Sequence, residues 1–232
     1  MKCIKMLVCF AIVFALLTLP SFAEKRATIN FMTIYKKDII IDGKFNDWDR
    51  IRRYSFDTDT TSGRRLNTNP TMKIAWNGKD TLYIYATLRS SRRIMSCPNS
   101  TTTNWWDYDV FELFMQTKVP SDIKSNQATA FHYAVSDRFL ITSSTYNGIC
   151  SLKTDSLVKN SKYNPYTKSF SFEMAVPLKG KFLKKIQAGD SIFLKFGTEM
   201  NSSSEFAILG YPKFNVNAFW SPYNYIECTF KK

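Results

Sequence analysis

The sequence predicts an all-β protein: a two-sheet antiparallel β-sandwich, of the jelly-roll or immunoglobulin-like kind, that follows a cleaved signal peptide. Several short segments alternate between apolar and polar residues, as strands with one buried face do. Turn signals such as Asn77-Gly78 separate these segments. No apolar pattern of helical period continues for three turns after the signal, and no strand–helix–strand spacing is present. Together these observations favour a sandwich over a parallel α/β fold.

Residues 1–23 have the three parts of a secretory signal peptide. Lys2 and Lys5 supply the positive region, an apolar run follows, and residues 21–23 (Ser-Phe-Ala) form a small-x-small cleavage site. We expect cleavage after Ala23 and export to the periplasm or the extracellular space. No later apolar run reaches the roughly 20 residues that a membrane helix needs, so no membrane span is predicted.

The composition predicts a globular domain with a basic surface. Of 232 residues, 44% are hydrophobic and 16% aromatic, which argues against disorder. The net charge is +13, but Lys and Arg are scattered in short pairs such as Arg52-Arg53 rather than gathered in a basic block. We interpret this charge as a source of solubility and surface attraction, and we predict no nucleic-acid partner. No repeat or linker divides residues 24–232, so one domain is predicted there.

Three cysteines remain after the signal: Cys97, Cys150 and Cys228. An odd number allows at most one disulfide bond, so the chain is not a disulfide scaffold. A pairing of Cys97 with Cys150 is one option that the sequence does not decide. Cys228 stands in a segment that reads as a buried strand.

Strands are predicted along the whole mature chain. In order they cover residues 27–35, 72–76, 82–88, 110–115, 130–135, 139–143, 152–159, 169–176, 191–199, 206–209 and 225–230. Between them we expect an apolar run broken by Asp42-Gly43, surface loops at 50–69 and 90–103, a helical turn at 182–186, and a loop at 215–222.

The stretch from residue 104 to 116, NWWDYDVFELFMQ, carries the most distinctive chemistry. Two tryptophans precede a strand in which Glu112 faces away from Phe111, Leu113 and Met115, because successive side chains alternate. Glu112 is then either a solvated or ion-paired residue on a half-exposed strand, or part of a binding surface with an aromatic platform beside it.

The order of the motifs resembles the family 9 carbohydrate-binding module found attached to xylanases. The resemblance spans nearly all of the mature chain. The matching segments are IDGKFNDW (41–48), MKIAWNGKDTLYIYATL (72–88), WWDYDVFELFM (105–115), FHYAVS (131–136), SFSFEMAVP (169–177), GDSIFLKFGTEMN (189–201) and a closing tryptophan loop.

The resemblance implies that the end of a sugar chain is held between two tryptophans, here Trp106 and Trp220. Glu112 and Asn217 match the family residues that hydrogen-bond the sugar hydroxyls. Aromatic faces suit this ligand, because a pyranose ring has a flat C–H face and an equator of hydroxyl groups. A mono- or oligosaccharide is therefore the expected partner, in polysaccharide use such as that of xylan.

Two further positions complete the implied site. Asp109 begins the aspartate–x–x–glutamate pattern that ends at Glu112, and His132 stands where the family's binding example has arginine. Trp105 is expected to lie outside the site. No catalytic residue or cofactor is predicted. Some family members hold structural calcium, but no calcium ligands are assigned in this chain.

Three other functions compete with sugar binding. A glycoside hydrolase would need a carboxylate pair, drawn from Asp107, Asp109, Glu112, Glu173 and Glu199. A haem-binding electron-transfer domain would need His132 together with Met115, Met174 or Met200. A bare interaction domain would keep the fold without a site.

Overall fold

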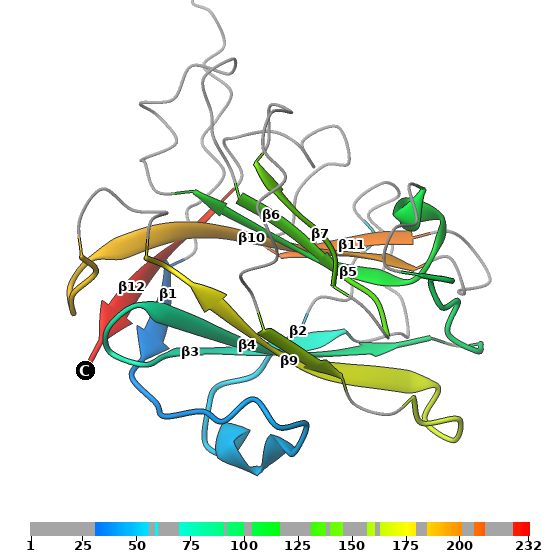
Figure 1. Ribbon diagram of the computed structural model, residues 1–232, viewed down its shortest axis with the longest axis horizontal. Coiled ribbons are helices and arrows are strands. Elements are labelled where there is room, and N and C mark those ends of the chain that lie inside the picture. The colour runs from blue at the N-terminus through cyan, green and yellow to red at the C-terminus, as the bar shows by residue number, and fades with distance from the viewer. Residues whose placement is uncertain are drawn as a thin grey trace, which may run out of the picture.

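The computed structural model describes residues 31–55, 59, 70–90, 92–99, 104–116, 131–137, 140–145, 157–160, 163–179, 185–200, 207–211 and 225–232. Two β-sheets lie face to face in this part of the chain, as Figure 1 shows. The predicted two-sheet sandwich is therefore confirmed.

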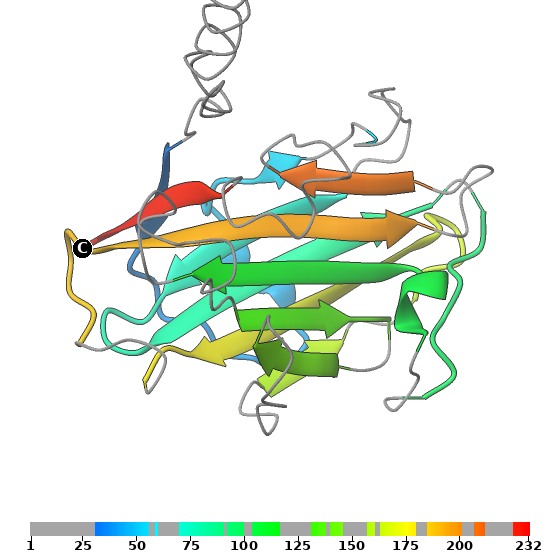
Figure 2. The same ribbon diagram turned by 90° about the horizontal axis from the view of Figure 1, so that it is seen from above.

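Within the described residues, seven strands form one sheet, in the order β1-β12-β10-β5-β6-β7, and β11 pairs with the second half of β10. Figure 2 looks down on this sheet. Its strands are β1 (Phe31–Tyr35), β5 (Val110–Gln116), β6 (Phe131–Val135), β7 (Leu140–Thr145), β10 (Ser191–Met200), β11 (Ala207–Tyr211) and β12 (Ile226–Lys231).

The second sheet, as far as it is described, has five strands in the order β2-β3-β4-β9-β8. Its strands are β2 (Tyr54–Ser55), β3 (Thr71–Trp76), β4 (Thr81–Arg89), β8 (Leu157–Asn160) and β9 (Ser169–Pro177). The β3–β4 hairpin turns at Gly78, whose φ of 82° suits glycine. The Asn77 side chain closes this turn by accepting bonds from the backbone N–H groups of Lys79, Asp80 and Thr81.

The structure differs from the predictions in two places. β1 and β12 pair in parallel, although an antiparallel sandwich was expected. β2 lies within the segment 50–69 that was predicted as loop. The only helical elements among the described residues are two short 3-10 helices, η1 (Phe45–Trp48) and η2 (Trp105–Asp107). Residues 182–184 of the helical turn predicted at 182–186 lie outside the described part.

The core between the sheets is built by the predicted alternation. β4 buries every second residue, and these residues are Leu82, Ile84, Ala86 and Leu88. Opposite them β5 contributes Phe111, Leu113 and Met115 to the same cluster. Cys228 on β12 is a buried free thiol, and Cys97 is also buried. Cys150 lies outside the described residues.

Residues 39–51 cover the outer face of the five-stranded sheet. Trp48 of η1 is buried there, and its indole packs on Tyr85 of β4 at 5.7 Å between ring centroids. The buried Glu173 of β9 accepts hydrogen bonds from the Trp48 indole N–H and from the backbone N–H of Asp42 and Gly43. The Ile-Asp-Gly segment is thus a turn that one carboxylate fixes to the sheet.

Candidate functional site

Glu112 faces outward from the seven-stranded sheet, as its place between core residues Phe111 and Leu113 requires. Its side chain is nevertheless 0% exposed, and every other residue of β5 is at most 2% exposed. The alternative in which Glu112 lies on a half-exposed strand is therefore wrong, because both faces of β5 are buried. A buried carboxyl group is costly unless its oxygens find partners.

Small residues flank Glu112 on both sides across the sheet. Strand register places Gly197 of β10 directly beside it on one side and Ala134 of β6 on the other. The same row continues to Gly210 on β11 and to Thr142 on β7. We call these five residues the small-residue row. Gly197 and Ala134 are themselves buried, so another molecule reaches the central carboxyl group over these short side chains only if what covers the row moves aside.

One oxygen of Glu112 pairs with His132, and the other has no hydrogen-bond partner within the described part of the chain. His132 Nε2 lies 2.7 Å from Glu112 Oε2, whereas the buried Oε1 lacks any hydrogen bond. The imidazole is also stacked on the Phe114 ring, with 4.4 Å between centroids and 7° between planes. The β5–β6 register explains this placement, because Phe114 and His132 are cross-strand partners.

Burial sets the charge of this pair. Burial raises the pKa of Glu112 well above its ordinary value and lowers the pKa of His132 to about 3. Burial therefore favours the uncharged form of each group, and their contact is then a hydrogen bond between neutral partners. A neutral carboxyl group with one unpaired oxygen is able to accept a hydrogen bond from a hydroxyl group.

Two more ionisable residues of β10 lie on the same face. Burial, Glu112 and Asp107 raise the pKa of Glu199 to about 9. Burial lowers the pKa of Lys195 to about 7, and its ammonium lies 4.5 Å from the centre of the Tyr225 ring. The sequence reading missed Lys195 and weighed Glu199 only as a hydrolytic carboxylate. The alternation of β10 was the signal that could have found both.

The two neighbouring tryptophans of η2 stand at the start of β5, where Figure 2 shows the short helix at one end of the sheet. Trp106 is 46% exposed, which is uncommon for so large an aromatic side chain. Trp105 is half-buried, 5.6 Å from the His132 ring and 5.4 Å from the Trp106 ring. Trp105 thus contacts both Trp106 and His132, and the expectation that it lies outside the sugar site stays a prediction.

The remaining predicted residues have different outcomes. Asp109 is buried and accepts a 2.8 Å hydrogen bond from the Met95 backbone N–H, while its own N–H donates to the Met95 carbonyl. This contact ties residues 92–99 to the start of β5. Asn217 and Trp220 lie outside the described residues, so the face-to-face arrangement of Trp106 and Trp220 stays a prediction.

Two solved structures resemble this arrangement of strands. The first is a family 9 carbohydrate-binding module from Caldicellulosiruptor kristjanssonii in complex with cellotriose, with a TM-score of 0.62 and 19% sequence identity over 87% of this chain and 94% of that one. The second is a candidate carbohydrate-binding protein from Bacteroides uniformis, with a TM-score of 0.61 and 12% identity over 88% of this chain and all of that one.

The fold is that of a family 9 carbohydrate-binding module. No protein-family model and no curated protein matches the sequence. The likeness is therefore one of three-dimensional structure, at an identity where sequence comparison alone gives little signal.

The family 9 fold separates the ligands that the haem alternative requires. Met115, Met174 and Met200 all lie in the core between the sheets. His132 lies on the outer face of the seven-stranded sheet, bonded to Glu112. The seven-stranded sheet lies between the His132 imidazole and these thioether groups. His132 and a methionine therefore cannot bind one haem iron as its two axial ligands.

The described part of this family 9 fold contains no group of three or more His, Cys, Asp or Glu side chains placed to hold a metal ion. Across the same residues, no helix is long and apolar enough to cross a bilayer.

Proposed function

We propose that the chain is a non-catalytic carbohydrate-binding protein whose site is the outer face of the seven-stranded sheet. The end of a sugar chain lies between Trp106 and Trp220, and Glu112 and Asn217 bond its hydroxyl groups. The observation that carries this proposal is the buried Glu112 Oε1, which has no hydrogen-bond partner and stands in the small-residue row.

The unpaired oxygen favours a ligand that donates hydrogen bonds. Leaving a buried acceptor unpaired costs about 1–3 kcal/mol. A sugar hydroxyl that approaches over Gly197 or Ala134 recovers this energy. The exposed face of Trp106 supplies the second requirement, an aromatic surface for the C–H face of the ring. Trp105 contacts Trp106 edge to face.

The charge state favours binding over hydrolysis. A glycosidase needs one carboxyl group as an acid and the other ionised, as nucleophile or base. Here the pKa values of Glu112 and Glu199 are both raised, mainly by burial, and Glu199 reaches about 9. Burial thus favours the protonated form of both carboxyl groups, which disfavours a role for either as the ionised partner.

The setting we propose is an exported protein in polysaccharide use. The resemblance to a family 9 module that binds cellotriose makes cello-oligosaccharides the first ligands to test. Xylo-oligosaccharides come second, because the family is known from xylanases. Export follows from the signal pattern of residues 1–23.

Calorimetric titration of the mature protein with both oligosaccharide series tests the proposal. Glu112→Leu keeps the volume but removes the acceptor, so we expect affinity to fall about 10- to 100-fold. Glu112→Gln keeps a neutral acceptor and should retain most of the affinity. Trp106→Ala should weaken binding about tenfold or more, whereas Tyr166→Ala, at a 95% exposed aromatic elsewhere, should have no effect.

Wild-type affinity in both Trp106→Ala and Glu112→Leu would place the sugar elsewhere and contradict the proposed site. An absence of binding to every neutral saccharide on a glycan array would contradict the proposed function itself.

A further inference from the structure

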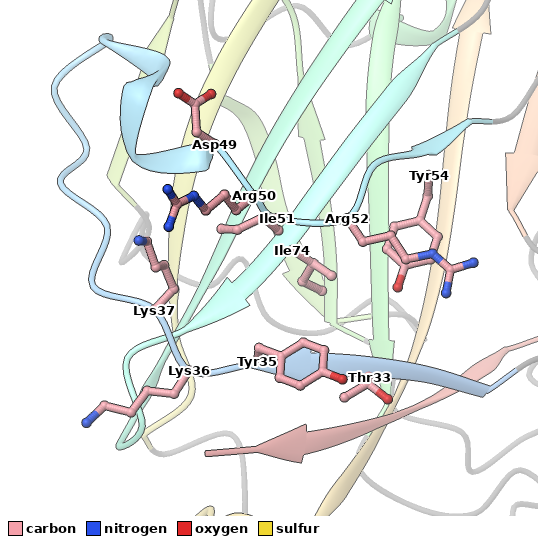
Figure 3. A pocket seen from close by; sticks show the side chains of 10 residues that line it. All are labelled: Thr33, Tyr35, Lys36, Lys37, Asp49, Arg50, Ile51, Arg52, Tyr54 and Ile74. Carbon is pink, nitrogen blue, oxygen red and sulfur yellow. The ribbon is translucent and has the colours of Figure 1, made fainter.

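A second pocket lies away from the Glu112 site, between β1, residues 49–54 and β3. Its volume is about 220 Å³, and none of the residues of the Glu112 site lines it. Figure 3 shows Tyr35 of β1 on one side, the chain around Ile51 on the other, and Ile74 of β3 between them. The two isoleucines give the pocket an apolar floor.

The rim of this pocket is strongly basic. Lys36, Lys37, Arg50 and Arg52 line it, against one carboxylate, Asp49. Within the described part of the chain, none of the four cations has an ion pair. Figure 3 draws the charged ends of Lys37 and Arg50 at one end of the pocket and that of Arg52 at the other. Unpaired cations around a concave, partly apolar surface attract an anion.

Two tyrosines stand among these cations. Tyr35 is 62% exposed, and its ring borders the pocket. The Arg52 guanidinium lies 5.1 Å from the centre of the Tyr54 ring, a cation–π distance that holds the planar cation in place. The pocket therefore offers an aromatic surface and hydrogen-bond donors together, whereas a simple anion uses only the donors.

The backbone conformation at Arg50 makes glycine a suitable test substitution. Arg50 has φ of 66°, in the left-handed region where a residue other than glycine costs about 1 kcal/mol. The turn is held by bonds from Asp49 N–H to the Asn46 carbonyl and from Ile51 N–H to the Trp48 carbonyl. Because glycine adopts this conformation without strain, Arg50→Gly removes the guanidinium at little cost to the turn.

We propose that this pocket binds an acidic sugar residue of a polysaccharide, a pyranose that carries a carboxylate or a sulfate ester. Lys37 and Arg50 take the anionic group, and Tyr35 lies against the C–H face of the ring. Arginine suits this role, because its fork of donors matches carboxylate and sulfate oxygens. The second site does not depend on the first, since the two share no residue.

The size of the pocket favours a sugar over a nucleic acid. At about 220 Å³ it is smaller than the roughly 300–1,000 Å³ of pockets for drug-sized ligands, and it suits one ring. Single-stranded nucleic acids are bound along a basic groove that follows several phosphates. The charged ends of Lys37, Arg50 and Arg52 instead lie at the two ends of one short cavity.

Titration calorimetry of the mature protein at 150 mM salt, roughly where a Debye length near 8 Å suppresses diffuse attraction, tests the proposal. The probes are an oligogalacturonate, a sulfated galactan oligosaccharide, a neutral cello-oligosaccharide, inorganic sulfate and single-stranded DNA. We expect one or both acidic saccharides to bind. Inorganic sulfate should bind at least tenfold more weakly, because it makes no contact with Tyr35.

Variants then locate the binding. Arg50→Gly should weaken acidic-sugar binding about tenfold or more, since it removes a charge-assisted contact, whereas Arg52→Ala, at the other end of the pocket, should weaken it less. Arg53→Ala is the matched control, an exposed cation in the same segment that does not line the pocket. Tyr35→Ala should weaken binding of the sugar but not of sulfate. Arg50→Gly should keep or raise the melting temperature, so its loss of binding is not a loss of folding.

Four results would overturn the proposal. Absence of binding to both acidic saccharides rejects the ligand class. If Arg53→Ala weakens binding as much as Arg50→Gly does, the saccharide is attracted diffusely to a basic surface. If inorganic sulfate or DNA binds as tightly as the acidic saccharides, the sugar ring is not recognised. A loss in Glu112→Leu assigns acidic-sugar binding to the sheet site instead.

Discussion

Replacement of Glu173 should destabilise the protein strongly, because one carboxylate satisfies three donors. The Trp48 indole N–H and the Gly43 backbone N–H each lie 2.8 Å from its oxygens, and the Asp42 N–H lies 3.2 Å away. Each donor left without a partner costs about 1–3 kcal/mol, and donors that reach water recover part of that. Glu173→Ala should therefore lower the free energy of unfolding by about 3–5 kcal/mol.

Two milder variants separate the contributions of the individual hydrogen bonds to this loss of stability. Trp48→Phe removes one donor and should cost about 1–3 kcal/mol, since hydrogen bonds to charged groups are the stronger ones. Glu173→Gln turns an amide N–H₂ toward a donor and should cost about 2–3 kcal/mol. In Glu173→Gln the new amide N–H₂ can face the Trp48 indole N–H, so that two donors oppose each other. Adding Trp48→Phe removes this repulsion, and the double variant should then lose about 1 kcal/mol less stability than the two single variants added together.

Urea denaturation followed by tryptophan fluorescence measures these values. Burial raises the pKa of Glu173, so its contribution to stability is complete below the ordinary value of 4.5 and falls as pH rises through the folded-state pKa. The decrease in the free energy of unfolding caused by Glu173→Ala should thus be smaller at pH 7 than at pH 4.5. A loss below about 1 kcal/mol at both pH values would refute the reasoning, since the bonds would then only offset desolvation.

Three other expectations follow. The pKa of Glu199 is raised from 4.5 to about 9, so stability is lost as pH rises through that interval, and Glu199→Gln should flatten the fall in melting temperature. The pKa of His132 is lowered from 6.5 to about 3, so stability is lost as pH falls through that interval; His132→Gln should remove this acid loss, and an unchanged profile would show that another group causes it. N-terminal sequencing of exported protein should begin directly after Ala23, and a sequence that starts at Met1 would contradict export by cleavage.

The fold could be predicted well because most of its strands carry a local pattern of alternating apolar and polar residues. The alternation in β4, β5, β9 and β10 gave both the strands and their inward faces. The parallel pairing of β1 with β12 could not be predicted in the same way. It depends on the meeting of distant segments, and neither strand carries a pattern that distinguishes a parallel neighbour from an antiparallel one.

The candidate site was predicted in part. Glu112 and His132 were named from the resemblance, but their hydrogen bond comes from the β5–β6 register, which sequence does not fix. The burial of Glu112 was missed because alternation says which face a residue is on, not what covers that face. The basic pocket was missed because Lys37, Arg50 and Arg52 reach it from separate segments, and scattered charges appear alike in a sequence.

The parallel pair has a consequence for the order in which the molecule assembles. Tyr35 and Lys231 are register partners although nearly two hundred residues separate them along the chain. Closing so large a loop is entropically costly and delays the contact until most other strands have paired. A growing or translocating chain therefore cannot complete the edge of its larger sheet until its last strand has emerged. If the chain is exported as its first residues predict, the β1–β12 seam should be among the last contacts to form.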